Sequence, residues 1–282
     1  MKLPGRQDAG LKLIWIKSPE TGSRLYLSHQ PRTACQDGLA MNDRCEVRIS
    51  DVPVLCAACQ ARQRGVCAAL DAEQLSTLSR SSTKKRLDMG SELIGDATTV
   101  EGYANILSGV VKLVKGLPDG REQIVGLQFA PDFLGRPFQA ESTVTAQAAT
   151  NVVLCSFPRR SVDALINQSP QLKQGLLQQA LRELDGARDW MLTLGRKNAL
   201  EKVSSYLLLI ASSVESAAKP QGQAVEFDLP MTRQEIADFL GLTIETVSRQ
   251  LTRLRIDGVI RIVQARHIVV DNPARLKICS GA

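Results

Sequence analysis

The segment 232–254 constrains the fold more than any other part of the chain, because it predicts two short helices separated by one tight turn. Thr232-Arg-Gln-Glu235 has the form of a capping box, in which two side chains three residues apart bond to each other's backbone N–H groups. Gly241 ends the first helix and Thr243 begins the second. This arrangement is typical of a helix-turn-helix.

Apolar and polar residues separate onto opposite faces of these two predicted helices. Small Ala237 allows the helices to approach closely, and the other inward positions are Ile236, Leu240, Val247, Leu251 and Leu254. The opposite face of the second helix carries Glu245, Ser248, Arg249 and Thr252. Because Arg can bond O6 and N7 of guanine and Glu can accept from N4 of cytosine, we predict a helix that reads DNA bases. The alternative is a solvated face with a structural Glu-Arg pair.

The residues after the second helix favour the same partner. Gly258 to Val270 alternate apolar and polar residues, which predicts a β-hairpin with a basic tip at Arg266 and His267, and therefore a winged helix-turn-helix. The chain has a formal net charge of +6 and a pI near 9.0. From residue 249 to residue 277 there are seven Lys or Arg against two acidic residues. A basic C-terminal end suits a polyanion such as double-stranded DNA.

Two further patterns precede this unit. From about Thr83 to Pro158, short apolar runs alternate with turns such as Leu117-Pro-Asp-Gly120, which indicates an all-β barrel. The barrel is expected to lead directly into a long helix over 170–194, and a second helix spans Ala199 to Ser213. The long helix has a heptad seam formed by Leu177, Ala180, Leu184, Ala187, Met191 and Leu194. We expect this seam to pair with a second copy in a homodimer, and the alternative is packing on the chain's own barrel.

These patterns predict an α+β chain of four parts. Residues 1–50 lack periodicity and form an N-terminal extension, which we expect to be dispensable, with Met41 as a candidate start. Residues 51–168 hold the cysteine-bearing loop and the barrel, residues 169–196 the dimerisation helix, and residues 197–282 the winged helix-turn-helix. Since no apolar run approaches the roughly 20 residues of a spanning helix, we expect a cytoplasmic protein with no membrane partner.

Seven cysteines in a cytoplasmic chain point to metal or redox chemistry, because that compartment keeps thiols reduced. Cys56, Cys59 and Cys67 follow the spacing C-x2-C-x7-C, a compact tripod on a loop. A complete tetrahedral or cubane metal site needs a fourth ligand, and the candidates are Cys35, Cys45, Cys155 and Cys279. His29 and His267 are the only histidines, which disfavours haem and a His-rich zinc site.

The chain resembles the Crp/Fnr superfamily of bacterial transcription regulators, and within it the oxygen-sensing FNR type. The resemblance covers about residues 50–272 and is closest in Pro230-Met-Thr-Arg-Gln-Glu-Ile-Ala-Asp-Phe-Leu-Gly-Leu-Thr-Ile-Glu-Thr-Val-Ser-Arg249. It extends to Ser108-Gly-Val-Val-Lys-Leu113, Asp132-Phe-Leu-Gly135 and Leu194-Gly-Arg-Lys-Asn-Ala199. The resemblance implies a double-stranded β-helix barrel, a dimer interface on the long helix, and RNA polymerase as a partner of an activator. It also implies that a TTGAT-type inverted repeat is read by Glu245, Ser248 and Arg249.

A cofactor is implied in the same way. FNR-type regulators keep a distant ligand in a context similar to Leu154-Cys-Ser-Phe-Pro158, so the resemblance favours a 4Fe-4S cluster on Cys56, Cys59, Cys67 and Cys155. Cys45 is the reserve ligand. The cysteine spacing looks like the longer form of alphaproteobacterial members. Spacing alone leaves open a zinc site or unligated thiols, and with them a regulator that does not sense oxygen.

Other classes of function have less support. Other superfamily members bind a cyclic nucleotide through a Glu and an Arg, but Arg136 and Pro137 follow Gly135 where the acid is expected, and residues 143–146 include no Arg. We therefore expect no nucleotide effector. The sequence has no Gly-rich phosphate loop, metalloprotease motif or Ser-His-Asp arrangement, so we expect no enzyme, with an iron-sulfur oxidoreductase as the enzymatic alternative. The preferred interpretation is an oxygen-responsive, DNA-binding homodimer.

Overall fold

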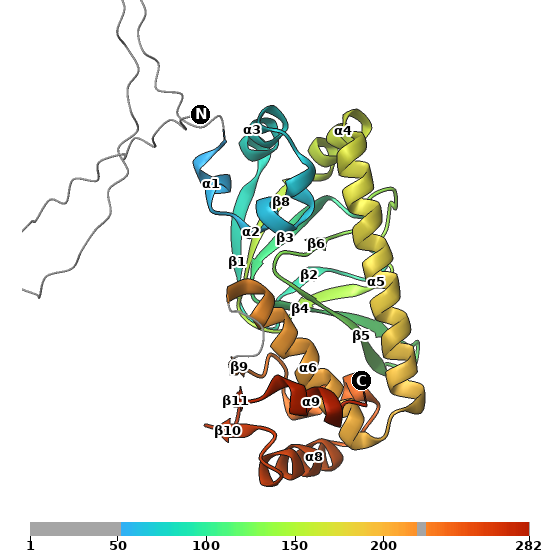
Figure 1. The fold of residues 1–282 in the computed structure, drawn as a ribbon. Helices are drawn as coiled ribbons and strands as arrows, with labels where there is room; N and C mark the ends of the chain where they lie inside the picture. Colours follow the sequence, from blue (N-terminus) through green and yellow to red (C-terminus); the bar gives the residue numbers. More distant parts are fainter. Residues whose placement is uncertain (1–51, 219–223, 282) are drawn as a thin grey trace, which may run out of the picture. The chain divides into compact units, whose positions relative to one another are not determined.

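A computed structural model of the chain describes residues 52–218 and 224–281. The predicted N-terminal extension, with Cys35, Met41 and Cys45, lies outside the described residues. In the part that is described, the chain passes from short helices through a β-barrel and a long helix to a small mixed domain at the C-terminus (Figure 1). No helix of this part is long and apolar enough to cross a membrane.

Short helical segments carry the cysteine tripod, where we predicted a loop. They are α1 (Val54–Ala57), α2 (Gln60–Arg64) and the 3-10 helix η1 (Val66–Ala69). The next helix is α3 (Ala72–Ser81). It begins at Asp71, whose side chain accepts a hydrogen bond from the Gln74 backbone N–H.

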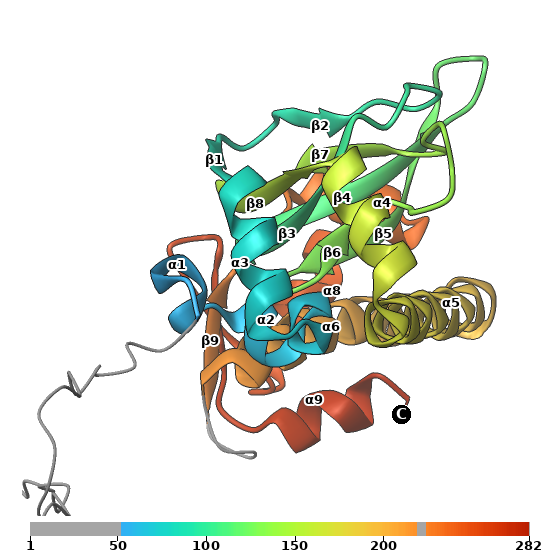
Figure 2. The same cartoon turned by 90° about the horizontal axis from the view of Figure 1, so that it is seen from above.

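The barrel consists of two antiparallel four-stranded sheets, seen from above in Figure 2. One sheet has the order β1-β8-β3-β6 and the other the order β2-β7-β4-β5. Their apolar side chains meet in a core that includes Ile106, Val111 and Leu154. The strands are β1 (Thr83–Leu87), β2 (Glu92–Ile94), β3 (Gly102–Ser108), β4 (Val110–Gly116), β5 (Glu122–Phe129), β6 (Phe133–Leu134), β7 (Thr145–Ala148) and β8 (Val152–Pro158).

Glycine turns connect these strands as the sequence predicts. Gly109 joins β3 to β4 with a φ of 90°, and a Cβ at this position would lie 2.4 Å from the Asn151 carbonyl oxygen. The hairpin of β4 and β5 closes where the Gly120 N–H donates to the Leu117 carbonyl over 2.9 Å. The predicted all-β barrel is therefore confirmed.

The last barrel strand does not lead directly into the long helix, although we expected it to. Helix α4 (Arg159–Gln168), which was not predicted, lies between the two. The long helix is α5 (Pro170–Arg196), with 27 residues, and it begins at Ser169, whose hydroxyl accepts from the Leu172 N–H. Its first turn packs into the same apolar core as Val162 and Leu165 of α4. Figure 1 shows α5 as the long yellow helix.

The C-terminal domain combines helices with a small antiparallel sheet of order β10-β11-β9. Helix α6 extends to Ala218, beyond the predicted end at Ser213. The core of the C-terminal domain is apolar and includes Tyr206, Phe227 and Leu254. The elements are α6 (Ala199–Ala218), β9 (Val225–Asp228), α7 (Arg233–Leu240), α8 (Ile244–Ile256), β10 (Arg261–Val263), β11 (His267–Val270) and α9 (Pro273–Cys279).

Candidate functional site

Helices α7 and α8 form the predicted helix-turn-helix, and local sequence explains their ends. Thr232 and Glu235 make both bonds of the capping box at the start of α7. Gly241 ends α7 with a left-handed φ of 60°, and the Thr243 hydroxyl accepts from the Thr246 N–H at the start of α8. The predicted inward side chains are all buried, namely those of Ile236, Ala237, Leu240, Val247, Leu251 and Leu254.

The outer face of α8 carries the four predicted base-reading residues. Glu245, Arg249 and Thr252 are exposed, whereas Ser248 is half-buried and its hydroxyl accepts from Arg233 Nη1 over 3.1 Å. Arg249 Nη2 donates to the Thr246 hydroxyl over 3.3 Å. Hydrogen bonds from its own backbone N–H and from the Thr243 side chain hold the pKa of Glu245 below its usual range. The face therefore offers a guanidinium donor and a charged carboxylate acceptor to bases in a groove.

The wing differs from the prediction at its tip. The turn between β10 and β11 has positive φ values at Gln264 and Ala265, and His267 lies within β11 beside β9. Its Nδ1 is 2.9 Å from a carboxylate oxygen of Asp228. Arg266 Nη2 donates back to the Leu229 carbonyl over 2.9 Å. Arg266 lies exposed in the turn, as predicted for a basic tip, whereas His267 is the first residue of β11. Both side chains also bond to the β9 region, which was not predicted.

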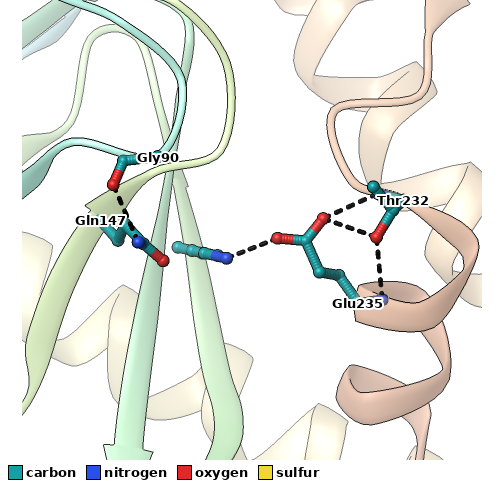
Figure 3. Close-up of polar contacts among 5 residues, drawn as sticks. Gly90, Gln147, Thr232 and Glu235 are labelled. Atoms are coloured by element: carbon teal, nitrogen blue, oxygen red, sulfur yellow. Dashed lines mark hydrogen bonds and ion pairs between the residues drawn. The ribbon is translucent and has the colours of Figure 1, made fainter.

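The helix-turn-helix also bonds to the barrel, and this contact was not predicted. One Glu235 carboxylate oxygen accepts from the Thr232 N–H and hydroxyl, each over 2.8 Å, as Figure 3 shows. The other oxygen accepts from the Nζ of Lys112 on β4. Gln147, the register partner of Lys112 on β7, donates to the Gly90 carbonyl over 2.9 Å (Figure 3). Burial opposes the Glu235 charge, but the bonds from Lys112 and Thr232 keep its pKa below the usual range.

The four cysteines of the predicted cluster lie on four different elements. Cys56 is in α1, Cys59 precedes α2, Cys67 is in η1 and Cys155 is in β8. We refer to these four residues as the thiol site. Cys67 is buried and the other three are half-buried. Cys279 belongs to α9, which packs on the separate C-terminal core.

The four thiols lie near one another, because they influence one another's pKa values. Burial raises the pKa of Cys67, a hydrogen bond from Asn105 lowers it, and the neighbouring thiols of Cys59, Cys155 and Cys56 raise it again, to about 12 in all. The pKa of Cys155 is also raised, first by burial and then by Cys59 and Cys56. Burial and the Cys59 thiol raise the pKa of Cys56 in the same way. The structure thus brings together the three predicted local cysteines and the distant one.

The thiol site offers four cysteine sulfurs as possible ligands, which is the donor set that an iron-sulfur cluster takes. Within residues 52–218 and 224–281, no three His, Cys, Asp or Glu side chains converge closely enough to hold one metal ion. A cubane takes one cysteine sulfur on each of its irons, so its ligands stand further apart than those of a tetrahedral zinc ion. The choice between a cluster, a zinc ion and unligated thiols stays a prediction.

The barrel also contains a cavity of about 630 Å³. It lies along β1, β2 and β3, and its lining includes Lys85, Glu92 and Glu101. Among the described residues that line it, none is an arginine. The expectation that no cyclic nucleotide binds here stays a prediction.

The heptad seam of α5 faces away from the chain's own core. All six seam residues are exposed, with Leu177 at 61% and Met191 at 73%. The buried positions of α5 are on other faces and include Leu172, Gln179 and Thr193. The seam therefore does not pack on the chain's own barrel, which was the alternative in the sequence analysis.

Comparisons with known proteins match both halves of the chain. A family model described as "Crp-like helix-turn-helix domain" matches residues 201–279, and one described as "Cyclic nucleotide-binding domain" matches residues 84–169. A "Probable transcriptional activator" from Rhizobium leguminosarum bv. viciae is 54% identical over 235 residues, which cover 83% of this chain and 96% of that protein. The "Transcriptional activator protein FnrL" of Cereibacter sphaeroides is 40% identical over 233 residues, which cover 81% and 94%. The structure of FixK2 from Bradyrhizobium japonicum is 31% identical, with a TM-score of 0.64, and the match covers 71% of this chain and 98% of that one.

A helix-turn-helix joined through a long helix to a barrel of this type defines a class of transcription regulators that bind DNA. The chain belongs to the Crp/Fnr family. It is accordingly a transcription regulator and not an enzyme, as predicted.

Proposed function

We propose that this regulator is an oxygen-responsive activator that holds a 4Fe-4S cluster through Cys56, Cys59, Cys67 and Cys155. With the cluster in place it binds a TTGAT-type inverted repeat as a homodimer and engages RNA polymerase. The observation that carries the proposal is the proximity of the four thiols, which come from α1, the N-cap of α2, η1 and β8. Thiolates are the ligands that iron-sulfur clusters take in proteins.

The thiol site lies against the dimerisation helix. Cys67 packs in one apolar core with Leu172 and Leu176 of α5. A Cβ added at Gly175 of α5 would lie 3.6 Å from the Ala69 Cβ of η1, so the two backbones approach closely. A cluster bound at this site would link the short helices to β8 through its ligands, and oxygen would break that link. Release of the four thiols frees η1, and the packing of η1 on α5 then changes.

This packing supports a switch at the dimer seam. The seam is apolar and exposed, and two of its six positions, Ala180 and Ala187, bury little apolar area. A dimer held by such a seam responds to a change of a few kcal/mol in the packing of α5. Two half-sites lie one helical turn apart on DNA, so a monomer loses most of its specific affinity. The outer face of α8 supports base reading by Glu245, Ser248 and Arg249, with Thr252 one turn further along.

Purification without oxygen, followed by a visible absorbance spectrum and by iron and sulfide analysis, tests the cofactor directly. The proposal expects iron and sulfide in equal amounts and an absorbance band that disappears in air. Protein that contains zinc and no sulfide would instead establish a zinc-stabilised regulator. Protein without any metal would leave a DNA-binding regulator that does not sense oxygen.

A further inference from the structure

A buried amide stands within the thiol site, on a strand that the sequence analysis did not connect with it. Asn105 lies in the middle of β3 and is 1% exposed. Its neighbours Ala104 and Ile106 point into the core between the two sheets, whereas Tyr103 belongs to the other core, which contains Cys67. Since side chains alternate along a strand, Asn105 faces the Tyr103 side. An amide buried among apolar side chains is costly unless it has a partner.

Two cysteines of the thiol site lie next to Asn105, one as a hydrogen-bond partner and one as its register neighbour. Its Nδ2 donates a hydrogen bond to the Cys67 sulfur over 3.1 Å. The strand register places Cys155 of β8 directly opposite Asn105. Side chains at directly opposite positions share one face, with Cβ atoms about 4.5 to 5.5 Å apart. The amide therefore lies beside two of the four proposed ligands, one local in the tripod and one distant in the sequence.

In the part of the chain that the structure describes, the oxygen atom of the Asn105 side chain makes no bond that would offset the cost of burying the amide. Among the described residues, the Asn105 Oδ1 atom is buried without a hydrogen-bond partner. Its single bond is to sulfur, which is a weak acceptor as a neutral thiol and a stronger one when it carries the negative charge of a metal ligand. The buried amide thus fits a charged sulfur better than an uncharged one.

We propose that Asn105 is a positioning residue for the cluster, which donates a hydrogen bond to the ligand sulfur of Cys67 and holds it beside Cys155. This inference rests on the proposed function. Hydrogen bonds to cluster sulfurs are among the means by which a protein sets the properties of the cluster. Loss of a group that supports a metal ligand typically lowers affinity by about 10- to 100-fold.

The experiment compares wild type with Asn105→Leu, Asn105→Ala and Tyr103→Phe, each reconstituted with iron and sulfide in the absence of oxygen. Leu fills the space without a donor, and Ala removes the side chain. Tyr103→Phe is the matched control. It removes a side-chain hydrogen bond from the same strand, but the acceptor is Asp163 and not a cysteine. The readouts are the rate at which an iron chelator removes iron without oxygen, the position of the visible absorbance band, and the thermal unfolding of each apoprotein.

We expect both Asn105 variants to lose iron about 10- to 100-fold faster than wild type and to shift the absorbance band. Tyr103→Phe should keep the wild-type rate and band. Apoprotein unfolding temperatures near wild type would show that the loss of iron does not come from unfolding. Wild-type rates in both Asn105 variants would overturn the role of Asn105, and so would an Asn105→Leu variant that behaves as wild type while only Asn105→Ala fails. Wild-type protein that takes up no iron and sulfide would overturn the proposed function itself.

Discussion

The outer face of α8 and the thiol site differ in what surrounds their functional side chains. On α8, Glu245 and Arg249 are exposed, and their bonds are to residues of the same helix or its N-cap. In the thiol site, Cys67 is 8% exposed and has neighbours from separate helices and strands. A change on α8 therefore alters binding and leaves the fold in place. A change in the thiol site alters the way in which several segments are held together.

The largest effect is expected in the thiol site. Replacement of any one of Cys56, Cys59, Cys67 or Cys155 by Ser should abolish the proposed cluster, because each thiolate would bind a different iron. Iron and sulfide analysis of protein purified without oxygen measures this loss. Cys279→Ser is the matched control, since Cys279 packs on the C-terminal core, and it should keep full iron. If Cys155→Ser keeps full iron while Cys45→Ser loses it, the fourth ligand is Cys45.

On α8 the effect should be confined to binding. Arg249→Ala is expected to weaken binding to the specific site by about 1 to 3 kcal/mol and binding to random DNA far less, because we propose that Arg249 reads a base edge. Titration of both DNAs with the dimer at one salt concentration measures the difference. Arg121→Ala removes the same charge from an exposed barrel turn and should leave specific binding unchanged. Equal losses on both DNAs for Arg249→Ala would mean that the side chain contacts only phosphate.

A smaller effect is expected at the ion pair of Lys112 and Glu235, whose side chains are 12% and 29% exposed. Glu235→Gln keeps a residue suited to the capping box but removes the charge, so we expect a loss of about 1 kcal/mol in the free energy of unfolding. The folded pKa of Glu235 is lowered, so its contribution is present above the ordinary value of 4.5 and is lost as the pH falls through the folded pKa. Urea unfolding at several pH values measures this, and the difference between wild type and Glu235→Gln should disappear in acid. The double variant with Lys112→Gln isolates the pair, and additive losses would contradict a direct interaction.

The smallest effect concerns the contact between η1 and α5. Gly175→Ala should raise the free energy of unfolding by about 0.5 to 1 kcal/mol, because Ala is favoured within a helix and its Cβ makes an ordinary contact with Ala69. Chemical denaturation of the apoprotein measures the gain. Gly186→Ala on the same helix has no neighbour within 4 Å and reports the helical preference alone. Destabilisation by Gly175→Ala alone would mean that η1 and α5 pack too closely to accept a methyl group.

The same contrast explains what could be predicted from the sequence. The capping box at Thr232, the left-handed glycine at 241 and the inward apolar positions are local patterns, and the structure confirms them. Strand β9 and helix α9 were missed, although Val225 and Phe227 alternate with acids and Asn272 precedes a proline. Because β9 was missed, the hydrogen bonds of His267 and Arg266 to that region were missed as well.

The thiol site could be predicted only in part, because it depends on contacts between distant segments. The spacing of Cys56, Cys59 and Cys67 indicated a ligand set, but the fourth member came from a resemblance. Asn105 was overlooked, although a polar residue within the apolar strand Tyr103-Ala-Asn-Ile106 was a usable signal. Its partner is 38 residues away in the sequence and no local pattern identifies it.

We propose that the state of the thiol site controls the pairing of α5 between two copies of the chain. Sedimentation of the same protein at low micromolar concentration, once with its cluster and without oxygen and once after exposure to air, tests the claim directly. We predict a dimer in the first sample, and largely monomer with weak binding to the inverted repeat in the second. A cluster-free protein that remains fully dimeric at this concentration would contradict the account.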